Sequence, residues 1–283
     1  MNENTNMSQP MHMARLTGYH LKMIAVISML IDHIGAVFVF GLIEASYRIT
    51  ASMQLSDAIG DKLVVWVSQH QELMWLIYEY MRYIGRIAFP IYCFLIVEGF
   101  LHTKSVGKYA LRLGVFALFS ELPFNMAMRS RAWDSSYNNV FFTLLLGLLA
   151  IWGISYVEKY YALWKEKNLD EFLGKLFALS AAGLVYVLTG YLAESIFCSD
   201  YGFAGVTTIV VIYLFRKFPW FAYLLGVLAL TVMTDSTEII ALLGLIPICY
   251  YSGKRGKQLK YAFYAFYPGH LLVLWGIMRL LGL

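Results

Sequence analysis

The chain alternates long apolar runs with short polar segments that carry most of its charge. Because about 20 apolar residues cross the hydrocarbon core of a bilayer, runs of this length predict membrane-spanning helices. Several runs lie near the lower limit of about 17 residues. We therefore predict an all-α, polytopic transmembrane helix bundle with about nine spanning helices, within a range of about eight to ten. The predicted runs are 19–41, 83–102, 109–128, 138–157, 172–193, 202–215, 219–234, 237–251 and 261–281.

The stretch 62–80 differs from these runs because it is amphipathic and contains Gln69, His70 and Glu72. We predict an interfacial or re-entrant helix there, with a spanning helix as the alternative. Residues 1–17 are polar and are predicted to form an N-terminal tail. Residues 18–283 then form a single transmembrane domain.

Composition supports the membrane interpretation. The chain is 60% hydrophobic and only 14% charged, and its mean hydropathy is +0.62. Soluble domains carry about 25% charged residues. The cysteines Cys93, Cys198 and Cys249 are scattered without a CxxC motif, so we predict neither a disulfide framework nor a metal site.

Loop charges set the predicted orientation. Nine helices with a cytosolic N-terminus place most cations on the cytosolic side, as the positive-inside rule requires. The net charge of +4 therefore reflects topology in a cell (inner or cytoplasmic) membrane rather than nucleic-acid binding. The cytosolic cations are Arg15, Lys22, Lys104, Lys108, Arg112, Lys159, Lys165, Lys167, Lys175, Arg216, Lys217, Lys254, Arg255, Lys257 and Lys260; the opposite side receives Glu44, Asp57, Asp61, Glu72, Glu79, Asp134, Glu194, Asp200, Asp235 and Glu238.

This topology sorts the polar residues within the apolar runs by depth. Polar groups in hydrocarbon must face a protein interior or a wet cavity. We therefore predict one cavity open outward and another open inward, with the first helix bordering both. The outer half holds Asp32, His33, Arg82, Arg86, Glu121, Asn125, Asn138, Asn139, Asp200 and Tyr201; the inner half holds Lys22, Glu98, His102, Arg112 and His270.

Lys22 and His33 lie in one apolar run, eleven positions apart. At about 100° per residue they share a helix face, and they are about 16 Å apart along its axis. A neutral imidazole suits general-base catalysis near neutral pH. Asp32 either fixes the tautomer of His33 or meets an arginine of another helix. The structural alternative for His33 is a hydrogen bond to a carbonyl across the bundle.

The segment 82–100 contains two arginines that share a helix face, Arg82 and Arg86. Pro90 cannot donate to the carbonyl of Arg86, which predicts a kink there. We predict that Arg82 anchors the interface and that Arg86 pairs with Asp32 or Glu121. Glu98 is either a site residue or a partner of Lys104 or Arg112.

Further polar candidates follow along the chain. Glu121 precedes Pro123, where we expect the helix to break, and it serves as an acid or base or neutralises Arg86. Asn138 is predicted to cap the next helix, and Asn139 to face the outer cavity. His270 lies in the inner half and bonds a cofactor or a carbonyl.

Several sequence segments resemble the TraX family, which includes the enzyme that acetylates conjugative pilin. They cover most of the chain in order: LIDHIG at 30–35, GRIAFPIYCFLIVEGF at 85–100, YALRLGVFALFSELPFN at 109–125, NVFFTLLLG at 139–147, DYG at 200–202 and YPGHLL at 267–272. Lys22 and His33 are also similar to the pattern of integral-membrane acyltransferases, in which ten residues separate a basic residue from a histidine. Those relatives carry arginines two positions apart, whereas Arg82 and Arg86 are four apart.

The resemblance implies acyl transfer from acetyl-CoA, with no metal. The donor would bind at the basic inner mouth, and His33 would activate an amine or hydroxyl that arrives from outside. The acceptor classes left open are a pilin-like peptide, a cell-surface polymer and a small molecule. The expected catalytic residues are His33, Asp32, Arg86, Glu121 and Asn139, with Arg86 or Asn139 stabilising the oxyanion; the expected donor-binding residues are Lys22, Arg112, Glu98 and His270.

Two other classes of function remain open from the residues themselves. A proton-coupled transporter would use Asp32, His33, Glu98 and Glu121 as a relay, although the sequence shows no internal repeat. A scaffold of an envelope complex would use the buried charges only to specify helix pairing.

Overall fold

The computed structural model describes residues 16–48, 58–166, 171–257 and 259–283, and all elements in this part of the chain are helices. The predicted tail 1–17 is described only at its last two residues. Arg15, Asp57 and Lys167 lie outside the described residues. The helices are α1 Gly18–His33, π-helix η1 Ile34–Val39, α2 Phe40–Tyr47, α3 Ile59–Gln69, α4 Gln71–Gly85, α5 Ala88–His102, α6 Val106–Arg129, α7 Val140–Glu166, α8 Glu171–Tyr191, π-helix η2 Leu192–Ile196, α9 Gly202–Leu214, α10 Pro219–Met233, 3₁₀-helix η3 Ser236–Gly244, α11 Leu245–Cys249 and α12 Lys260–Leu280.

The structure confirms a helical membrane protein, but it gives fewer long apolar helices than the sequence predicts. Within the described residues, four are long and apolar enough to cross a membrane: Gly18–Tyr47, Gln71–His102, Val140–Lys165 and Glu171–Ile196. The predicted runs 202–215, 219–234 and 237–251 form shorter apolar helices. At 1.5 Å per residue, a helix of 13 residues reaches only about 20 Å, short of the hydrocarbon thickness of about 30 Å.

The segment 62–80, predicted as one interfacial helix, belongs to two helices. The break lies at His70, whose backbone (φ −126°, ψ 35°) is not helical. Helix α4 packs along α1 and continues through a turn into α5. This turn lies at Arg86, just before Pro90, so the predicted kink is confirmed.

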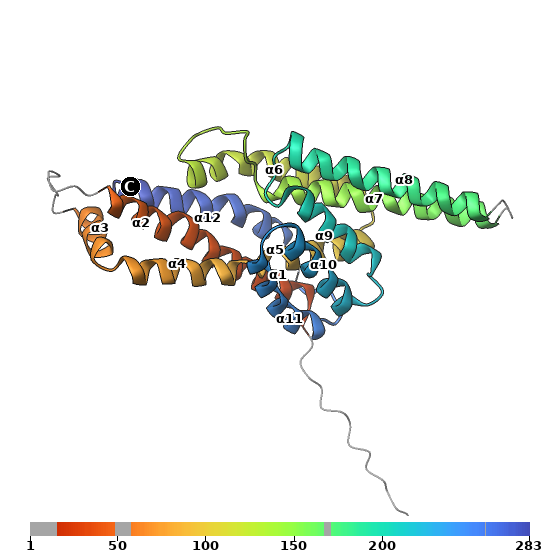
Figure 1. Cartoon of the computed structure of the whole chain (residues 1–283), viewed down its shortest axis with the longest axis horizontal. Helices are drawn as coiled ribbons and strands as arrows, with labels where there is room; N and C mark the ends of the chain where they lie inside the picture. The colour runs from red at the N-terminus through yellow and green to blue at the C-terminus, as the bar shows by residue number, and fades with distance from the viewer. Residues whose placement is uncertain (1–15, 49–57, 167–170, 258) are drawn as a thin grey trace, which may run out of the picture.

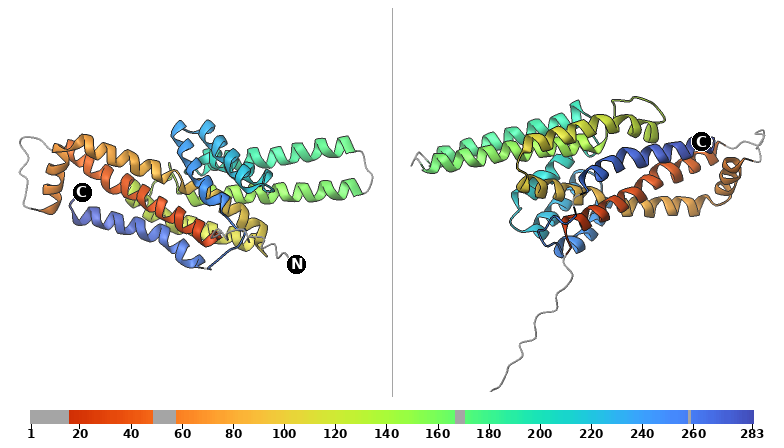
Figure 2. Two further views of the ribbon diagram at one scale, coloured as in Figure 1. Left: turned by 90° about the horizontal axis from the view of Figure 1, so that it is seen from below. Right: turned by 180° about the vertical axis from the view of Figure 1, so that it is seen from behind.

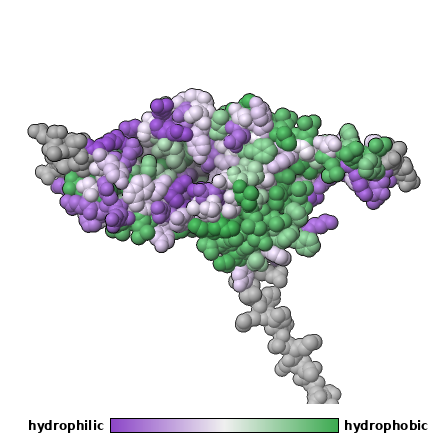
Figure 3. All heavy atoms as spheres, in the orientation of Figure 1, coloured by the Kyte–Doolittle hydropathy of each residue, from purple (hydrophilic) through white to green (hydrophobic). Residues whose placement is uncertain are grey.

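The molecule is elongated, and its helices extend in two directions from a central cluster (Figures 1 and 2). Helices α1, α2, α4 and α12 extend toward one end, where α3 lies. The antiparallel pair α7 and α8 extends toward the other end. The short helices α5, α9, α10 and α11 pack between them. Figure 3 shows apolar side chains gathered over this central region and more hydrophilic ones toward the end that holds α3.

One close approach fixes α4 against α1. A Cβ atom built on Gly85 would lie 2.0 Å from Asp32 Oδ1 and 2.4 Å from Asp32 Cβ. A side chain at this position would therefore overlap both the carboxylate and the base of the Asp32 side chain.

We predict that Gly85→Ala lowers the free energy of unfolding by about 1–3 kcal/mol because it overpacks this contact. Gly183→Ala in α8 is the matched control, since its added Cβ has no neighbour within 4 Å. Helix propensity makes that control neutral or stabilising by up to about 1 kcal/mol. Thermal unfolding in detergent measures both variants, and equal midpoints would contradict the close approach.

Candidate functional site

His33 lies at the junction of α1 with the π-helix η1. π-helical turns are rare and occur frequently at functional sites. The His33 side chain is buried, with 9% of its surface exposed. The sequence singled out His33 as a base, and the structure places it at this irregular point of the first helix.

His33 is hydrogen-bonded to His270 of α12. The distance from His33 Nδ1 to His270 Nε2 is 2.6 Å, and the two rings are nearly parallel, at 9°. His270 Nδ1 lies 2.8 Å from the carbonyl oxygen of Phe266. The sequence placed His270 in the inner half with the donor-binding residues. The structure instead places it against His33, and the hydrogen bond to a carbonyl is the alternative that the sequence left open.

This chain of bonds assigns the protons of two neutral imidazoles. A carbonyl only accepts, so His270 Nδ1 must donate to Phe266, which leaves His270 Nε2 as an acceptor. His33 Nδ1 must then donate to His270, and His33 Nε2 keeps its lone pair. His33 is therefore oriented as a base, and His270 is the residue that holds its tautomer.

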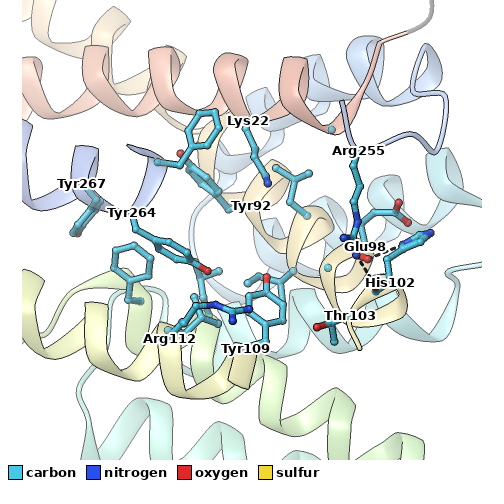
Figure 4. Close-up of a pocket in the computed structure, with 18 of the residues that line it drawn as sticks. Lys22, Tyr92, Glu98, His102, Thr103, Tyr109, Arg112, Arg255, Tyr264 and Tyr267 are labelled. Carbon is cyan, nitrogen blue, oxygen red and sulfur yellow. Dashed lines mark hydrogen bonds between the residues drawn. The ribbon is translucent and has the colours of Figure 1, made fainter. Parts of the chain in front are cut away.

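A cavity of about 340 Å³ lies at the end of the bundle where α1 begins. Three cations from three elements line it: Lys22 of α1, Arg112 of α6 and Arg255 of the loop before α12 (Figure 4). We call it the basic cavity. The structure thus brings together Lys22, Arg112 and Glu98, as the sequence predicted, and adds Arg255. His270 is not among its lining residues.

The cations of the basic cavity have no carboxylate partner among the described residues. Glu98 accepts a hydrogen bond from the hydroxyl of Tyr251 at 2.7 Å, so it is not the partner of Lys104 or Arg112 that the sequence allowed. The Nε atom of Arg112 is buried without a hydrogen-bond partner. Positive charge therefore accumulates at this mouth, which favours an anionic ligand.

The histidine pair lies directly behind the inner wall of this cavity. Met29 and Tyr267 form part of the wall. The Tyr267 ring lies 5.9 Å from that of His33 and 5.8 Å from that of His270, measured between centroids. Met29 precedes His33 by one helical turn. A chain-like ligand that fills the cavity would thus end beside the imidazoles.

Asp32 and Arg86 form two separate ion pairs. Arg82 Nη1 lies 2.6 Å from Asp32 Oδ2, so Asp32 meets an arginine and does not orient His33. Adjacent helical residues point about 100° apart, which separates the two side chains. Arg86 Nη1 lies 2.7 Å from Glu238 Oε1, which corrects the predicted pairing of Arg86 with Asp32 or Glu121. Arg82 is the residue that pairs with Asp32, and its role as an interface anchor stays a prediction.

Glu238 lies in a different environment from the one its sequence predicts. The loop charges predict Glu238 on the outer side, whereas its side chain is only 2% exposed, in the helix η3. A signal existed, because Glu238 lies within the apolar run 237–251 and buried carboxylates need a partner. Its Oε2 atom and Arg86 Nε have no hydrogen-bond partner in the described structure.

Glu121 and Asn139 join α6 to the start of α7. Glu121 accepts hydrogen bonds from Asn125 Nδ2 (3.1 Å), Asn139 N (3.2 Å) and Asn139 Nδ2 (2.6 Å). Asn139 Oδ1 accepts from the N–H of Phe141 at 3.0 Å, so Asn139 rather than Asn138 caps α7. Both side chains are buried, and no hydrogen bond connects them to His33 among the described residues.

Helix α6 continues through Pro123, which corrects the predicted break before that residue. A proline within a helix removes one hydrogen bond but does not have to end the helix when packing holds both sides. Here α6 packs against both α7 and α12.

The fold and the buried histidine pair define a helical membrane protein with an internal polar site. The chain belongs to the TraX family: the sequence pattern described as "TraX protein" matches residues 17–278. A relative from Dichelobacter nodosus, described as "Probable fimbrial assembly protein FimC, serogroup H1", is 29% identical over 142 residues. That match covers 48% of this chain and 45% of the relative, so the chain spans less than half of the relative's length. No solved structure matches the chain.

We predict that Arg86→Met destabilises the protein because it leaves the Glu238 carboxylate buried without its partner. Breaking a buried pair costs about 3 kcal/mol or more. The double variant Arg86→Met with Glu238→Leu should recover most of this loss. The control is Arg48→Met, since Arg48 pairs with Glu44 on the surface, where side chains are 68% and 59% exposed and a pair contributes less than about 1 kcal/mol. Similar unfolding midpoints for the two single variants would contradict the buried pair.

Proposed function

We propose that the protein is a membrane-embedded acyltransferase that moves an acetyl group from cytosolic acetyl-CoA to an amine or hydroxyl of an extracytoplasmic acceptor. The observation that carries the proposal is the oriented pair of His33 and His270 behind the wall of the basic cavity. Family membership and the relative named for fimbrial assembly support this proposal.

The basic cavity suits the donor. The nucleotide of CoA carries several negative charges, and Lys22, Arg112 and Arg255 supply positive charge at the mouth. A cavity of about 340 Å³ accommodates the thin pantetheine arm, while the nucleotide would remain outside it. The thioester would then lie near Met29 and Tyr267, beside His33.

In the proposed reaction, His33 Nε2 removes the proton from the acceptor nitrogen or oxygen. That atom attacks the acetyl carbonyl carbon, a new C–N or C–O bond forms, and the C–S bond breaks. The thiolate of CoA leaves with the electron pair and takes up the proton. Direct transfer and an acetylated-histidine intermediate both fit this geometry.

The other expected catalytic residues are engaged elsewhere. Arg86 pairs with Glu238, and Asn139 bonds Glu121 and the N–H of Phe141. We therefore propose that Asp32, Arg86, Glu121 and Asn139 fasten helices around the site, and that His33 acts in chemistry with His270 as its positioning residue.

The alternative function is proton-coupled transport. The expected relay consists of Asp32, His33, Glu98 and Glu121, but each has a different partner: Arg82, His270, Tyr251 and the two asparagines. Among the described residues, no hydrogen bond joins any two members of this relay. This arrangement favours acyl transfer.

We predict that Lys22→Ala weakens acetyl-CoA binding about tenfold in low salt, and that added salt narrows the difference. The control is Lys108→Ala, because Lys108 is exposed near the same mouth but does not line the cavity. Titration calorimetry of the detergent-purified proteins measures both. Equal affinities of the two variants for acetyl-CoA would contradict the proposal that the basic cavity binds the donor.

We predict that His33→Ala lowers the rate of acetyl-CoA turnover about 10²–10⁴-fold and leaves acetyl-CoA binding unchanged, because a general base accelerates a reaction by about this factor. His270→Gln should keep part of the rate because its side-chain oxygen still accepts from His33 Nδ1, whereas His270→Leu removes that acceptor. Release of free thiol measures turnover. Normal turnover in His33→Ala would overturn the proposed base, and retained binding with ion or solute flux would favour the transporter.

A further inference from the structure

A second cavity of about 300 Å³ opens at the end of the molecule that holds α3, away from the start of α1. Its lining includes residues at the ends of three helices: Arg48 after α2, Ser130 after α6 and Gly282 after α12. We call it the distal cavity. None of the residues predicted from the sequence to line an outer cavity belongs to it.

The two cavities lie along the same three helical segments. α1 with its continuation η1 and α2, together with α6 and α12, contributes to both. On α6, Tyr109 lines the basic cavity and Met128 lines the distal one. Nineteen residues of helix separate them, which is about 29 Å, close to the hydrocarbon thickness of a bilayer. The two mouths are therefore spaced as openings to the two sides of a membrane.

The histidine pair lies between the cavities. Met29 lines the basic cavity one turn before His33, and Val37 lines the distal cavity about one turn after it. On α12, Tyr267 and Trp275 lie on either side of His270 in the same order. Each cavity thus ends within about one to one and a half turns of the imidazoles.

The walls of the distal cavity differ in chemistry from those of the basic cavity. Phe40, Trp275 and three methionines, Met126, Met128 and Met278, supply apolar and adaptable surface.

The charges in its lining do not give it a basic character. Its charged lining residues are Glu44, Arg48, Asp61 and Arg279. Glu44 and Arg48 pair with each other at 3.1 Å, and Arg279 lies over the ring of Trp275, 5.8 Å from its centroid. Acid and base are therefore both present, so the cavity has no excess of cations to attract a polyanion such as the nucleotide of CoA.

We propose that the distal cavity binds the acyl acceptor, and that this acceptor is an apolar compound that presents one amine or hydroxyl toward His33. The proposal rests on the acyltransferase function proposed above. The apolar part would pack against the aromatic and methionine side chains, and the nucleophile would meet the acetyl carbon beside the imidazole, having entered from the side opposite the CoA mouth.

The test fills the cavity from two helices, with Ala36→Phe and Ala127→Phe as separate variants. Both alanines line the cavity. The matched control is Ala265→Phe, since Ala265 is exposed on α12 and lines neither cavity. The acceptor probes are octylamine and octanol, compared with glucosamine. Mass spectrometry measures the acetylated product, and free-thiol release without acceptor measures the donor half of the reaction.

We expect the two filling variants to raise the KM for octylamine or octanol at least about tenfold, while thiol release and acetyl-CoA binding stay at the level of the control. An unchanged KM in both filling variants would overturn the proposal. Preferential acetylation of glucosamine by the unmodified protein would overturn the apolar acceptor class.

A photoreactive alkyl amine carrying a diazirine separates this proposal from the acyltransferase proposal, because its adducts form without turnover. We expect adducts on peptides containing Met128 or Trp275, reduced by Ala36→Phe and not by Ala265→Phe. Such adducts without any acetyl-CoA turnover would retain the apolar-amine site and overturn the acyltransferase function. If octylamine is acetylated but the adducts form only on peptides outside the distal cavity, the acyltransferase proposal stands and the distal cavity is not the acceptor site.

Discussion

Hydrocarbon cannot solvate polar groups, and this constraint explains the arrangement of the buried side chains. Asp32 meets Arg82, Glu238 meets Arg86, and Glu121 meets Asn139. Each of these contacts joins two helices that are distant in sequence or separated by a loop. The cations of the basic cavity have no carboxylate partner among the described residues. The charged groups that pair helices are thus distinct from the cations that line the basic cavity.

The sequence predicted the features that depend on local rules. The helical period and the positive-inside rule placed Lys22 and Arg112 at one mouth, and Pro90 predicted the turn at Arg86. The partner of Arg86 could not be predicted, because it depends on how η3 packs against the junction of α4 and α5. Packing across α7 and α12 likewise allowed α6 to continue through Pro123.

His270 shows why depth along the membrane was harder to predict than orientation. Counting every apolar run as a full span placed His33 and His270 in different halves. His33 lies fifteen residues after the start of α1 and His270 ten residues after the start of α12, yet the two imidazoles are hydrogen-bonded. The two helices therefore begin at different depths, which counting residues from the start of each run does not show. The pair between α1 and α12 depends on this packing, and it is the part of the candidate site that no local sequence pattern contains.

The use of one imidazole to orient another has a physical consequence for a buried base. In a hydrolase triad, a carboxylate holds the tautomer of the histidine. A buried anion costs several kcal/mol unless it is paired, and here the neighbouring carboxylate of Asp32 is already paired with Arg82. His270 holds the tautomer through a neutral acceptor, itself fixed by the carbonyl of Phe266. The site can therefore orient a base deep in the helix bundle without adding an unpaired charge to it.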